Sequence, residues 1–175
     1  MSDDQAAGRL QRAKAGDGRA FEELLAPVLD PAFRLAMTML KDRGAAEDAV
    51  QEAALKAWRK LGGFRVGSQV RPWFLAIVAN ECRSMGRTRW WNVMRLGEFP
   101  PRTASDDRSA ERLDLDAALD RLSQEQLLPL TLYYHLDLPI EEVARVLGCS
   151  TGAARVRIHR SLAALRPGMV MEADA

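Results

Sequence analysis

The residues whose types and spacing point most directly to a function are basic side chains late in the sequence. From Thr151 onward, one stretch carries four arginines and a histidine and no acidic residue: Arg155, Arg157, His159, Arg160 and Arg166. Guanidinium groups bond phosphate oxygens and fork onto guanine edges in the major groove of DNA. The stretch therefore predicts a DNA-reading element, and the alternative is an ordinary basic surface helix.

Two short helices joined by a tight turn are predicted to hold these basic residues. The first begins at Pro139, whose fixed φ suits a helix start, and its apolar residues recur at helical spacing: Ile140, Val143, Ala144 and Leu147. Gly148 ends that helix and Ser150 caps the next one, so the turn is about three residues long. The second helix has its own apolar stripe: Ala154, Ile158, Leu162 and Leu165. This is a helix-turn-helix pattern, and its candidate DNA contacts are Ser150, Thr151, Arg155, Arg157, His159 and Arg160.

A second candidate for nucleic-acid binding lies in the middle of the chain. A glycine-rich loop, 62–70, precedes a predicted helix, and between Cys82 and Gly97 there are four arginines and no acid. Aromatic rings and cations together hold unpaired bases, because every base has a π-face and every nucleotide a phosphate. The candidate residues are Phe64, Arg65, Trp73, Asn80, Arg83, Arg87 and Arg89. Trp73 precedes Ile77 by one helical turn, so it fits the core as well as a stacking platform, and the sequence leaves that choice open.

An acidic and polar face is predicted on the helix from Gly44 to Leu61. Its members lie three or four residues apart: Asp48, Gln51, Glu52 and Leu55. The residues expected to face the core are Val50, Ala54, Ala57 and Trp58. The acidic face fits a partner with a basic surface, and the alternative is a solvated charged face.

No arrangement of residues predicts catalysis or metal binding. The two histidines, His135 and His159, lie in different predicted helices, and neither has a nucleophile or metal ligand nearby in sequence. Cys82 and Cys149 are isolated, which argues against a structural zinc and for inert thiols in a reducing compartment. We therefore expect no catalytic residue, metal, cofactor or small-molecule substrate.

The composition limits the class of protein further. The chain has 175 residues, 47% of them hydrophobic, which is enough for one large or two small packed domains. The net charge is only +1, so any nucleic-acid surface must come from local clusters of charge. No apolar run approaches the length of a membrane span or a signal-peptide core, and we expect a cytoplasmic protein without membrane insertion.

Helical periodicity accounts for every regular segment, and the predicted fold class is all-α. Early helices are expected over 3–15, 18–40 with a break around Pro27 and Pro31, 44–61 and 70–88. Ser123 and Gln126 form a capping box for a later helix, in which Pro129 is expected to produce a kink. The expected organisation is two small helical domains, 1–91 and 113–175, joined by a flexible acidic linker at 92–112, with the helix-turn-helix in the second domain.

With these segments in order, the chain resembles a bacterial RNA polymerase sigma factor of the extracytoplasmic-function (ECF) type. The resemblance runs from about Gly16 to Arg166 and rests on several ordered motifs. They are AEDAVQE at 46–52 with AWR at 57–59, then Phe64, RPWFLAIVAN at 71–80 and Arg87, then IEEVARVLG at 140–148 and GAARVRIHR at 152–160. This chain departs from the family pattern by having Ala153 and Val156 where the family usually has hydroxyl residues, and Ser84 where it usually has Asp.

The resemblance implies a role for each candidate surface. The acidic face would bind the clamp helix of the largest subunit of core RNA polymerase, the middle segment would melt and read promoter DNA, and the helix-turn-helix would bind the minus-thirty-five element. It also implies a cognate anti-sigma protein as a partner. Two other functions stay open: a helix-turn-helix regulator that binds operator DNA as a dimer without polymerase, and a protein-binding decoy of sigma type.

Overall fold

The computed structural model describes residues 3–96, 115 and 117–165, and all regular structure in this part of the chain is helical. The predicted all-α class is thereby confirmed. The chain divides into two compact units, Met1–Thr88 and Arg89–Ala175, each of which is described by itself. Most of the predicted linker, at 97–114, lies outside the described residues.

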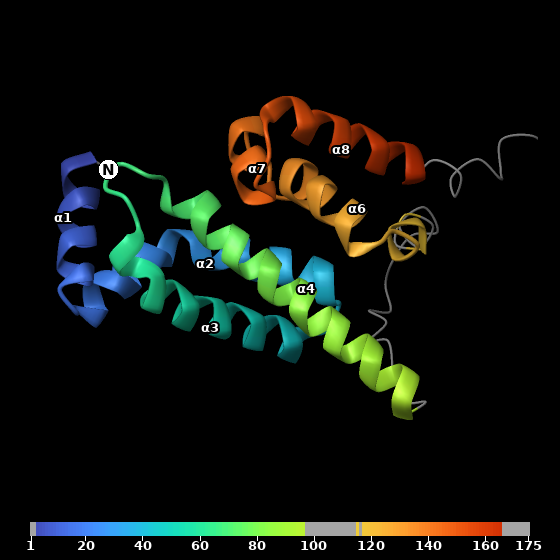
Figure 1. Cartoon of the computed structure of the whole chain (residues 1–175), viewed down its shortest axis with the longest axis horizontal. Coiled ribbons are helices and arrows are strands. Elements are labelled where there is room, and N and C mark those ends of the chain that lie inside the picture. The colour runs from blue at the N-terminus through green and yellow to red at the C-terminus, as the bar shows by residue number, and fades with distance from the viewer. Residues whose placement is uncertain (1–2, 97–114, 116, 166–175) are drawn as a thin grey trace, which may run out of the picture. The chain divides into compact units, whose positions relative to one another are not determined.

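The first unit contains the early helices of the chain (Figure 1). They are α1 (Asp3–Lys14), α2 (Gly18–Leu40), α3 (Arg43–Lys60), the short 3₁₀ helix η1 (Leu61–Gly63) and, as far as Thr88, α4 (Val70–Leu96). α2 packs on both α1 and α3, and α1 also touches η1 at the end of α3. The helix α4 continues to Leu96, past residue 92, where the sequence predicted a linker to begin, because Gly97 and Pro100 come only after that point.

The helix α2 runs without interruption through Pro27 and Pro31, so the predicted break is wrong. The two prolines lie one turn apart, with Pro27 exposed and Pro31 half-buried. Next to the prolines, and with Pro31 at its edge, α2 carries a continuous buried stripe: Leu24, Leu25, Val28, Ala32 and Leu35. Burial of this stripe stabilises the helix enough to outweigh the backbone hydrogen bonds that the prolines remove.

Side-chain caps begin the two central helices of the first unit. The Ala20 amide donates to Asp17 Oδ1 at 3.1 Å and the Ala45 amide to Asp42 Oδ1 at 2.8 Å. Asp17 also accepts from Arg12 Nη2 at 2.6 Å, which ties the end of α1 to the start of α2. Each cap satisfies an amide that the helix itself leaves unpaired, so the starts of α2 and α3 are fixed locally.

A row of alanines forms the buried side of α3. Ala46, Ala49, Ala53 and Ala57 are each 0% exposed. The sequence prediction of this side was right for Ala57, whereas Val50 and Ala54 are half-buried and Trp58 is 37% exposed. Trp58 makes an edge contact with Phe21 of α2, with ring centroids 5.0 Å apart. Small side chains in this row let α3 approach its neighbours closely, and larger ones lie at the margins.

The second unit contains the later helices. Residues 115 and 117–120 are helical, followed by α6 (Gln124–Leu130), the π-helix η2 (Thr131–His135), α7 (Ile140–Leu147) and α8 (Thr151–Leu165). The predicted capping box of Ser123 and Gln126 is confirmed. The helical backbone passes through the buried Pro129 and changes register one turn later, where the Leu136 amide donates to the Thr131 carbonyl at 2.9 Å. Both α6 and α7 pack on α8.

Candidate nucleic-acid and partner interfaces

The acidic face predicted on α3 exists as an exposed surface. All four of its residues, Asp48, Gln51, Glu52 and Leu55, are exposed, on the side of α3 away from the alanine row. Leu55 is 45% exposed and places one apolar group among polar ones. The four residues together form the polar surface with an apolar centre that the sequence predicted.

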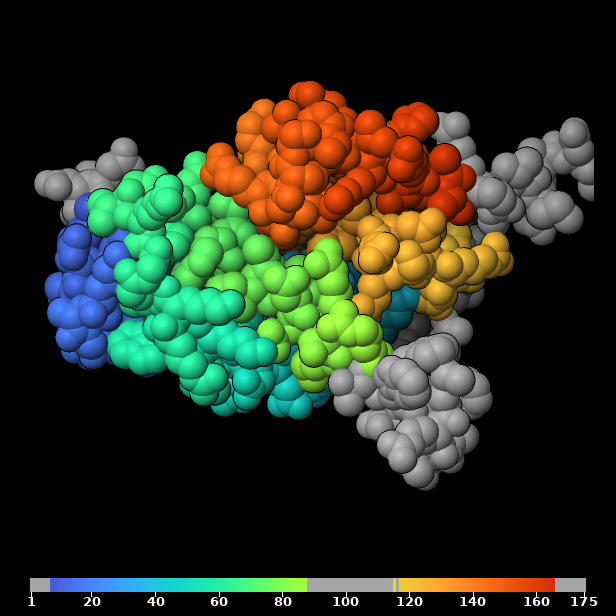
Figure 2. Space-filling model, viewed as in Figure 1, coloured from blue at the N-terminus to red at the C-terminus, as the bar shows by residue number. Residues whose placement is uncertain are grey.

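An ion pair joins α3 to α4 beside this face. Lys56 Nζ donates to both carboxylate oxygens of Glu81, at 2.7 Å each, across 25 positions of sequence. The Glu81 side chain is 12% exposed, whereas the Lys56 side chain is 40% exposed. Leu55 precedes the lysine and Asn80 precedes the glutamate, so the pair fixes the acidic face of α3 relative to the candidate DNA residues of α4. Figure 2 shows α3 and α4 on the same visible face of the first unit.

The loop between η1 and α4 is exposed except at Phe64. Phe64 is 6% exposed and packs against Trp73, with ring centroids 4.5 Å apart and planes tilted by 48°. Arg65, Val66 and Gly67 are exposed, and Gly67 adopts a positive φ of 83°. Trp73 is half-buried, so one part of its ring packs on Phe64 while another part reaches the surface. The aromatic pair thus anchors the loop and leaves its arginine accessible.

One stripe on α4 collects the predicted DNA residues of that helix. We call it the α4 stripe, and its residues recur three or four positions apart: Trp73, Ala76, Asn80, Arg83 and Arg87. Asn80 and Arg87 are exposed. The Arg83 side chain donates from Nη1 to Asn80 Oδ1 at 3.1 Å, while its buried Nε has no hydrogen-bond partner among the described residues. The backbone of Arg89 lies in α4, but its side chain lies outside what the structure describes.

The turn of the helix-turn-helix has the predicted length and caps. Gly148 adopts φ 62° and ψ 39°, and its amide donates to the Arg145 carbonyl while the Cys149 amide donates to the Ala144 carbonyl at 3.0 Å. These two bonds are the Schellman pattern that closes a helix with a left-handed residue. Ser150 Oγ accepts from the Ala153 amide at 3.2 Å and so caps α8, as predicted.

The basic residues of α8 are all exposed but spread over a wide arc. Ala154, Ile158 and Ser161 form the buried side. Since successive residues are about 100° apart, Arg160 and the 49%-exposed Val156 lie roughly opposite that side, with Arg155 and His159 on one flank and Arg157 on the other. Arg157 Nη1 donates to the Leu147 carbonyl at 3.5 Å, which places a cation at the end of α7. Ser150 is exposed and Thr151 is half-buried at the start of α8.

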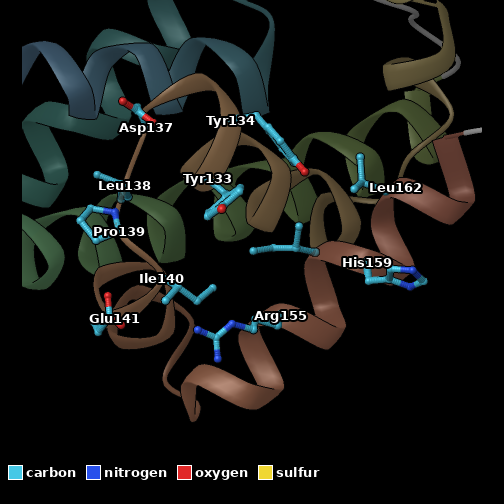
Figure 3. Close-up of a pocket in the computed structure, with 11 residues that line it drawn as sticks. Tyr133, Tyr134, Asp137, Leu138, Pro139, Ile140, Glu141, Arg155, His159 and Leu162 are labelled. Carbon is cyan, nitrogen blue, oxygen red and sulfur yellow. The ribbon is translucent and has the colours of Figure 1, made fainter.

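An open groove beside α8 was missed by the sequence analysis. It has a volume of about 810 Å³ and lies between η2, the segment that leads into α7, and α8 (Figure 3). Its apolar lining includes Leu138, Ile140, Ile158 and Leu162, while Tyr133 and Tyr134 are 39% and 59% exposed. The charged residues that line it are Asp137, Glu141, Arg155 and His159. The one signal in the sequence was a pair of adjacent tyrosines, but a π-helix that turns both toward one groove is not readable from periodicity.

The cysteines differ in environment. Cys82 is buried, and burial, followed by the charge of Glu81, raises the pKa of its thiol to about 12. This agrees with the predicted inert thiol, because the reactive thiolate is disfavoured. Cys149 is half-buried in the turn before α8. Among the described residues, no group of side chains has the makeup of a metal site, and none of their helices has the length and hydropathy to span a membrane.

Comparison with known families matches both units of the chain. Residues 16–92 match Sigma-70 region 2, and residues 112–165 match Sigma-70, region 4. The chain is 30% identical to the ECF RNA polymerase sigma factor SigC of Mycobacterium tuberculosis, over 94% of this chain and 91% of that protein. It is 31% identical to the ECF RNA polymerase sigma factor EcfG of Rhodopseudomonas palustris, over 74% of this chain and 73% of that protein.

Solved structures give the same result. The sigma factor RpoE of Bartonella quintana, solved in complex with the anti-sigma factor NepR, matches with a TM-score of 0.69 and 28% identity, over 87% of this chain and 98% of that one. CnrH, solved with the cytosolic domain of CnrY, matches with a TM-score of 0.71 and 25% identity, over 98% and 99%. Two helical units of sigma type therefore define a transcription initiation factor. The chain belongs to the ECF group of sigma-70 family RNA polymerase sigma factors.

Proposed function

We propose that the first unit of this sigma factor carries both the main polymerase contact and the downstream promoter contact. The observation that carries the proposal is the Lys56–Glu81 ion pair, because it holds the acidic face of α3 and the α4 stripe in one fixed arrangement. Asp48, Gln51, Glu52 and Leu55 bind the basic clamp helix of the largest polymerase subunit. Leu55 supplies the apolar centre of that contact, and the three polar residues supply its orientation.

The downstream DNA element is held by the loop and the α4 stripe. Arg65, Asn80, Arg83 and Arg87 are the polar contacts, and Arg83 is oriented by its bond to Asn80. Phe64 supports the loop from inside through Trp73, whose half-buried ring is the proposed stacking partner of an unpaired base. The same stripe continues along α4, and Arg89 extends the set of cations.

The upstream element is read by α8 of the second unit. Arg155 is proposed as a base or groove contact, and Arg157 and Arg160 as backbone contacts, with Ser150, Thr151 and His159 at the borders of the DNA surface. The bond of Arg157 to the Leu147 carbonyl fits a positioning role beside a phosphate contact. The predicted functional boundaries, 1–91 and 113–175, are kept except that α4 extends the first module to Leu96, so that the tether between the modules begins after that residue.

The proposed partners are core RNA polymerase, promoter DNA and a cognate anti-sigma protein, and the protein acts in the cytoplasm, where polymerase is. The anti-sigma partner is inferred by analogy, because the solved relatives RpoE and CnrH were captured with anti-sigma factor NepR and with the cytosolic domain of CnrY. The protein carries out no chemistry of its own and needs no cofactor. It changes which DNA the polymerase binds and opens.

The polymerase contact is tested by the double substitution Gln51→Ala with Glu52→Ala. Both residues are exposed, so the substitutions should change the free energy of unfolding by no more than about 0.5 kcal/mol while abolishing binding to core enzyme. The matched control is Gln11→Ala with Glu22→Ala, at exposed positions on α1 and α2. Unchanged affinity of the first variant for core polymerase in a pull-down and titration would refute the assignment.

The role of Arg155 is tested in the holoenzyme. Loss of a guanidinium that forks onto guanine costs roughly 1–3 kcal/mol of discrimination, whereas loss of a phosphate contact weakens all sequences alike. Arg155→Ala should therefore flatten the preference for the upstream element, and Arg160→Ala should lower affinity without changing preference. A uniform loss in Arg155→Ala would show that the two roles are wrongly assigned.

The alternative function is an operator-binding regulator that acts without polymerase. The two functions differ in whether the free chain or only the holoenzyme binds promoter DNA selectively. With a net charge of +1 the free protein neutralises few phosphates, whereas polymerase fixes both DNA-binding modules and raises their mutual effective concentration to roughly millimolar. Selective promoter binding should appear only with core polymerase, in gel shifts and in run-off transcription. Tight, selective binding by the isolated chain at physiological salt would favour the regulator.

A further inference from the structure

A hydrogen-bonded pair on α4 fixes the orientation of the Asn80 amide. Arg83 Nη1 donates to Asn80 Oδ1 at 3.1 Å, from about one turn further along the helix. A guanidinium carries five N–H donors and no acceptor, so the amide atom that faces it has to be the oxygen. The Asn80 Nδ2 group, which carries two N–H donors, is therefore the end of the amide that Arg83 leaves uncovered.

Arg83 is held in place more firmly than an ordinary surface arginine. The residue is half-buried, and its Nε atom is buried without a hydrogen-bond partner among the described residues. A buried donor without an acceptor costs stability, whereas the exposed Arg87 adds a cation to the α4 stripe without that cost. The burial of Arg83 is therefore explained better by a guanidinium that has to stay beside Asn80 than by a need for positive charge alone.

The surface of this pair offers hydrogen-bond donors. Asn80 is exposed, and its Nδ2 has no hydrogen-bond partner within the described part of the chain. Arg83 keeps N–H groups on Nη1 and Nη2 beyond the one that binds Asn80. One lone pair remains on Asn80 Oδ1, but a donor group placed there would also meet the Arg83 cation. The neighbouring acid, Glu81, has both carboxylate oxygens bound by Lys56. An incoming group thus meets two donors side by side.

We propose that Arg83 restricts Asn80 to the role of a hydrogen-bond donor, and that the pair thereby selects an unpaired base with two adjacent acceptors. The inference rests on the proposed function of Asn80 as a contact of the downstream element. Arg83 acts here as a positioning residue for the Asn80 amide, and it also supplies the second donor.

The four bases differ in whether they offer two adjacent acceptors. Guanine offers O6 and N7, and cytosine offers O2 and N3. Adenine places its N6 donor beside each of the acceptors N1 and N7, so it suits an asparagine whose carbonyl and amino groups are both available. A donor-only pair therefore favours guanine or cytosine and disfavours adenine. Such two-bond recognition discriminates between bases by roughly 5- to 150-fold.

The test uses the full chain bound to core RNA polymerase and promoter DNA whose non-template strand is unpaired over the downstream element. Each unpaired position carries each of the four bases in turn, and affinity is measured by competition. The variant Asn80→Ala identifies the position at which base preference depends on Asn80. At that position the unsubstituted protein should bind guanine or cytosine about tenfold more tightly than adenine, within the range expected for two-bond recognition.

Substitutions of Arg83 then separate its positioning role from its charge. Arg83→Met removes the donor and releases the Asn80 carbonyl, so the roughly tenfold preference against adenine should disappear. Arg83→Lys keeps a cationic donor for Asn80 Oδ1 and should retain most of that preference. The matched control is Arg87→Met, which removes a cation of the same stripe that forms no hydrogen bond with Asn80. It should lower the affinity for all four bases alike.

The outcomes separate this inference from the proposed function on which it rests. If Arg83→Met weakens binding to all four bases by the same factor, Arg83 is only a cation of the stripe and the proposal is overturned, while Asn80 stays a base contact. Tighter binding of adenine than of guanine and cytosine by the unsubstituted protein also overturns it. If no position depends on Asn80, the proposed function of that residue is wrong and the inference fails with it.

Discussion

In the first unit α3 and α4 are held by side chains far apart in the sequence, whereas in the second unit α8 is held at its start by caps within a few residues of it. The Lys56–Glu81 pair and the alanine row of α3 belong to the first mode. The Schellman turn at Gly148 and the cap by Ser150 belong to the second. Packing on α6 and α7 then completes the placement of α8.

This difference follows from the number of helices whose surfaces each unit has to hold in place. The first unit presents two surfaces on two helices, so their relative position depends on long-range packing. The second unit presents one helix, α8, as its proposed DNA-reading element, and the direction of α8 is determined mainly by the turn that precedes it. The first unit should therefore be sensitive to changes of side-chain volume and charge, and the second to changes of backbone conformation.

The largest effect is expected from adding volume to the alanine row. Ala53 is fully buried, so Ala53→Leu should lower the free energy of unfolding of the first unit by about 3 kcal/mol and weaken binding to polymerase. The control Ala26→Leu, at an exposed site on α2, should change stability by no more than about 0.5 kcal/mol. Chemical denaturation followed by tryptophan fluorescence measures both, and equal stability of the two variants would contradict the role of the row.

A smaller loss is expected when the ion pair is broken. Glu81→Gln leaves Lys56 without its charged partner at a site where Glu81 is nearly buried, and we expect a loss of about 2 kcal/mol. The control Asp30→Asn breaks the exposed pair with Arg34, whose loss should cost less than about 0.5 kcal/mol. If both variants lost the same stability, the Lys56–Glu81 pair would be no more than a surface contact.

In the second unit the sensitive position is Gly148. Its φ of 62° is a conformation that side chains strain to adopt, so Gly148→Ala should cost about 1 kcal/mol and weaken binding to the upstream element. Gly152, inside α8, has room for a Cβ, since the nearest contact is Ser150 Oγ at 4.0 Å. Gly152→Ala should therefore stabilise the helix, and thermal melting of both variants should move in opposite directions.

The smallest effect is a change with pH that is expected for the Asp17 cap of α2 and not for the Ser150 cap of α8. The Ala20 amide, and after it the Arg12 side chain, lowers the pKa of Asp17 below 3.8. A lowered pKa means that the cap stabilises α2 above the unfolded value and is lost as pH falls through the lower folded value. The Ala20 amide resonance should show that step, while the Ala153 amide, bonded to a serine, should show none. A step with a midpoint above 3.8 would contradict the assigned cause.

Local signals in the sequence predicted the helix-turn-helix closely. Pro139, Gly148 and Ser150 act on bonds within a few residues of themselves, and the structure places all three as predicted. The exposed positions of Gln51 and Glu52 also followed from helical spacing alone. The DNA and polymerase roles of these surfaces stay predictions, because they depend on partners.

The features that the sequence did not predict have a common cause, which is packing between segments far apart in the chain. Pro27 and Pro31 locally predict a break, but the buried stripe of α2 keeps the helix continuous. Val50 was expected inside and lies half-buried, because the tight alanine row, rather than the larger side chains, forms the contact. Phe64 was predicted among the downstream DNA residues, and that role stays a prediction; its packing on Trp73 was not predicted, because it appears only in three dimensions.

The sequence by itself determined that this is a helical protein with a helix-turn-helix, its caps and an acidic face, because each of these depends on bonds or spacing within one or two turns. Only the tertiary structure decided that Lys56 meets Glu81, that Phe64 lies beneath its loop and that the tyrosines of η2 line a groove with α8. These arrangements depend on which helix faces meet, and that outcome is set by the packing of whole surfaces rather than by any short segment.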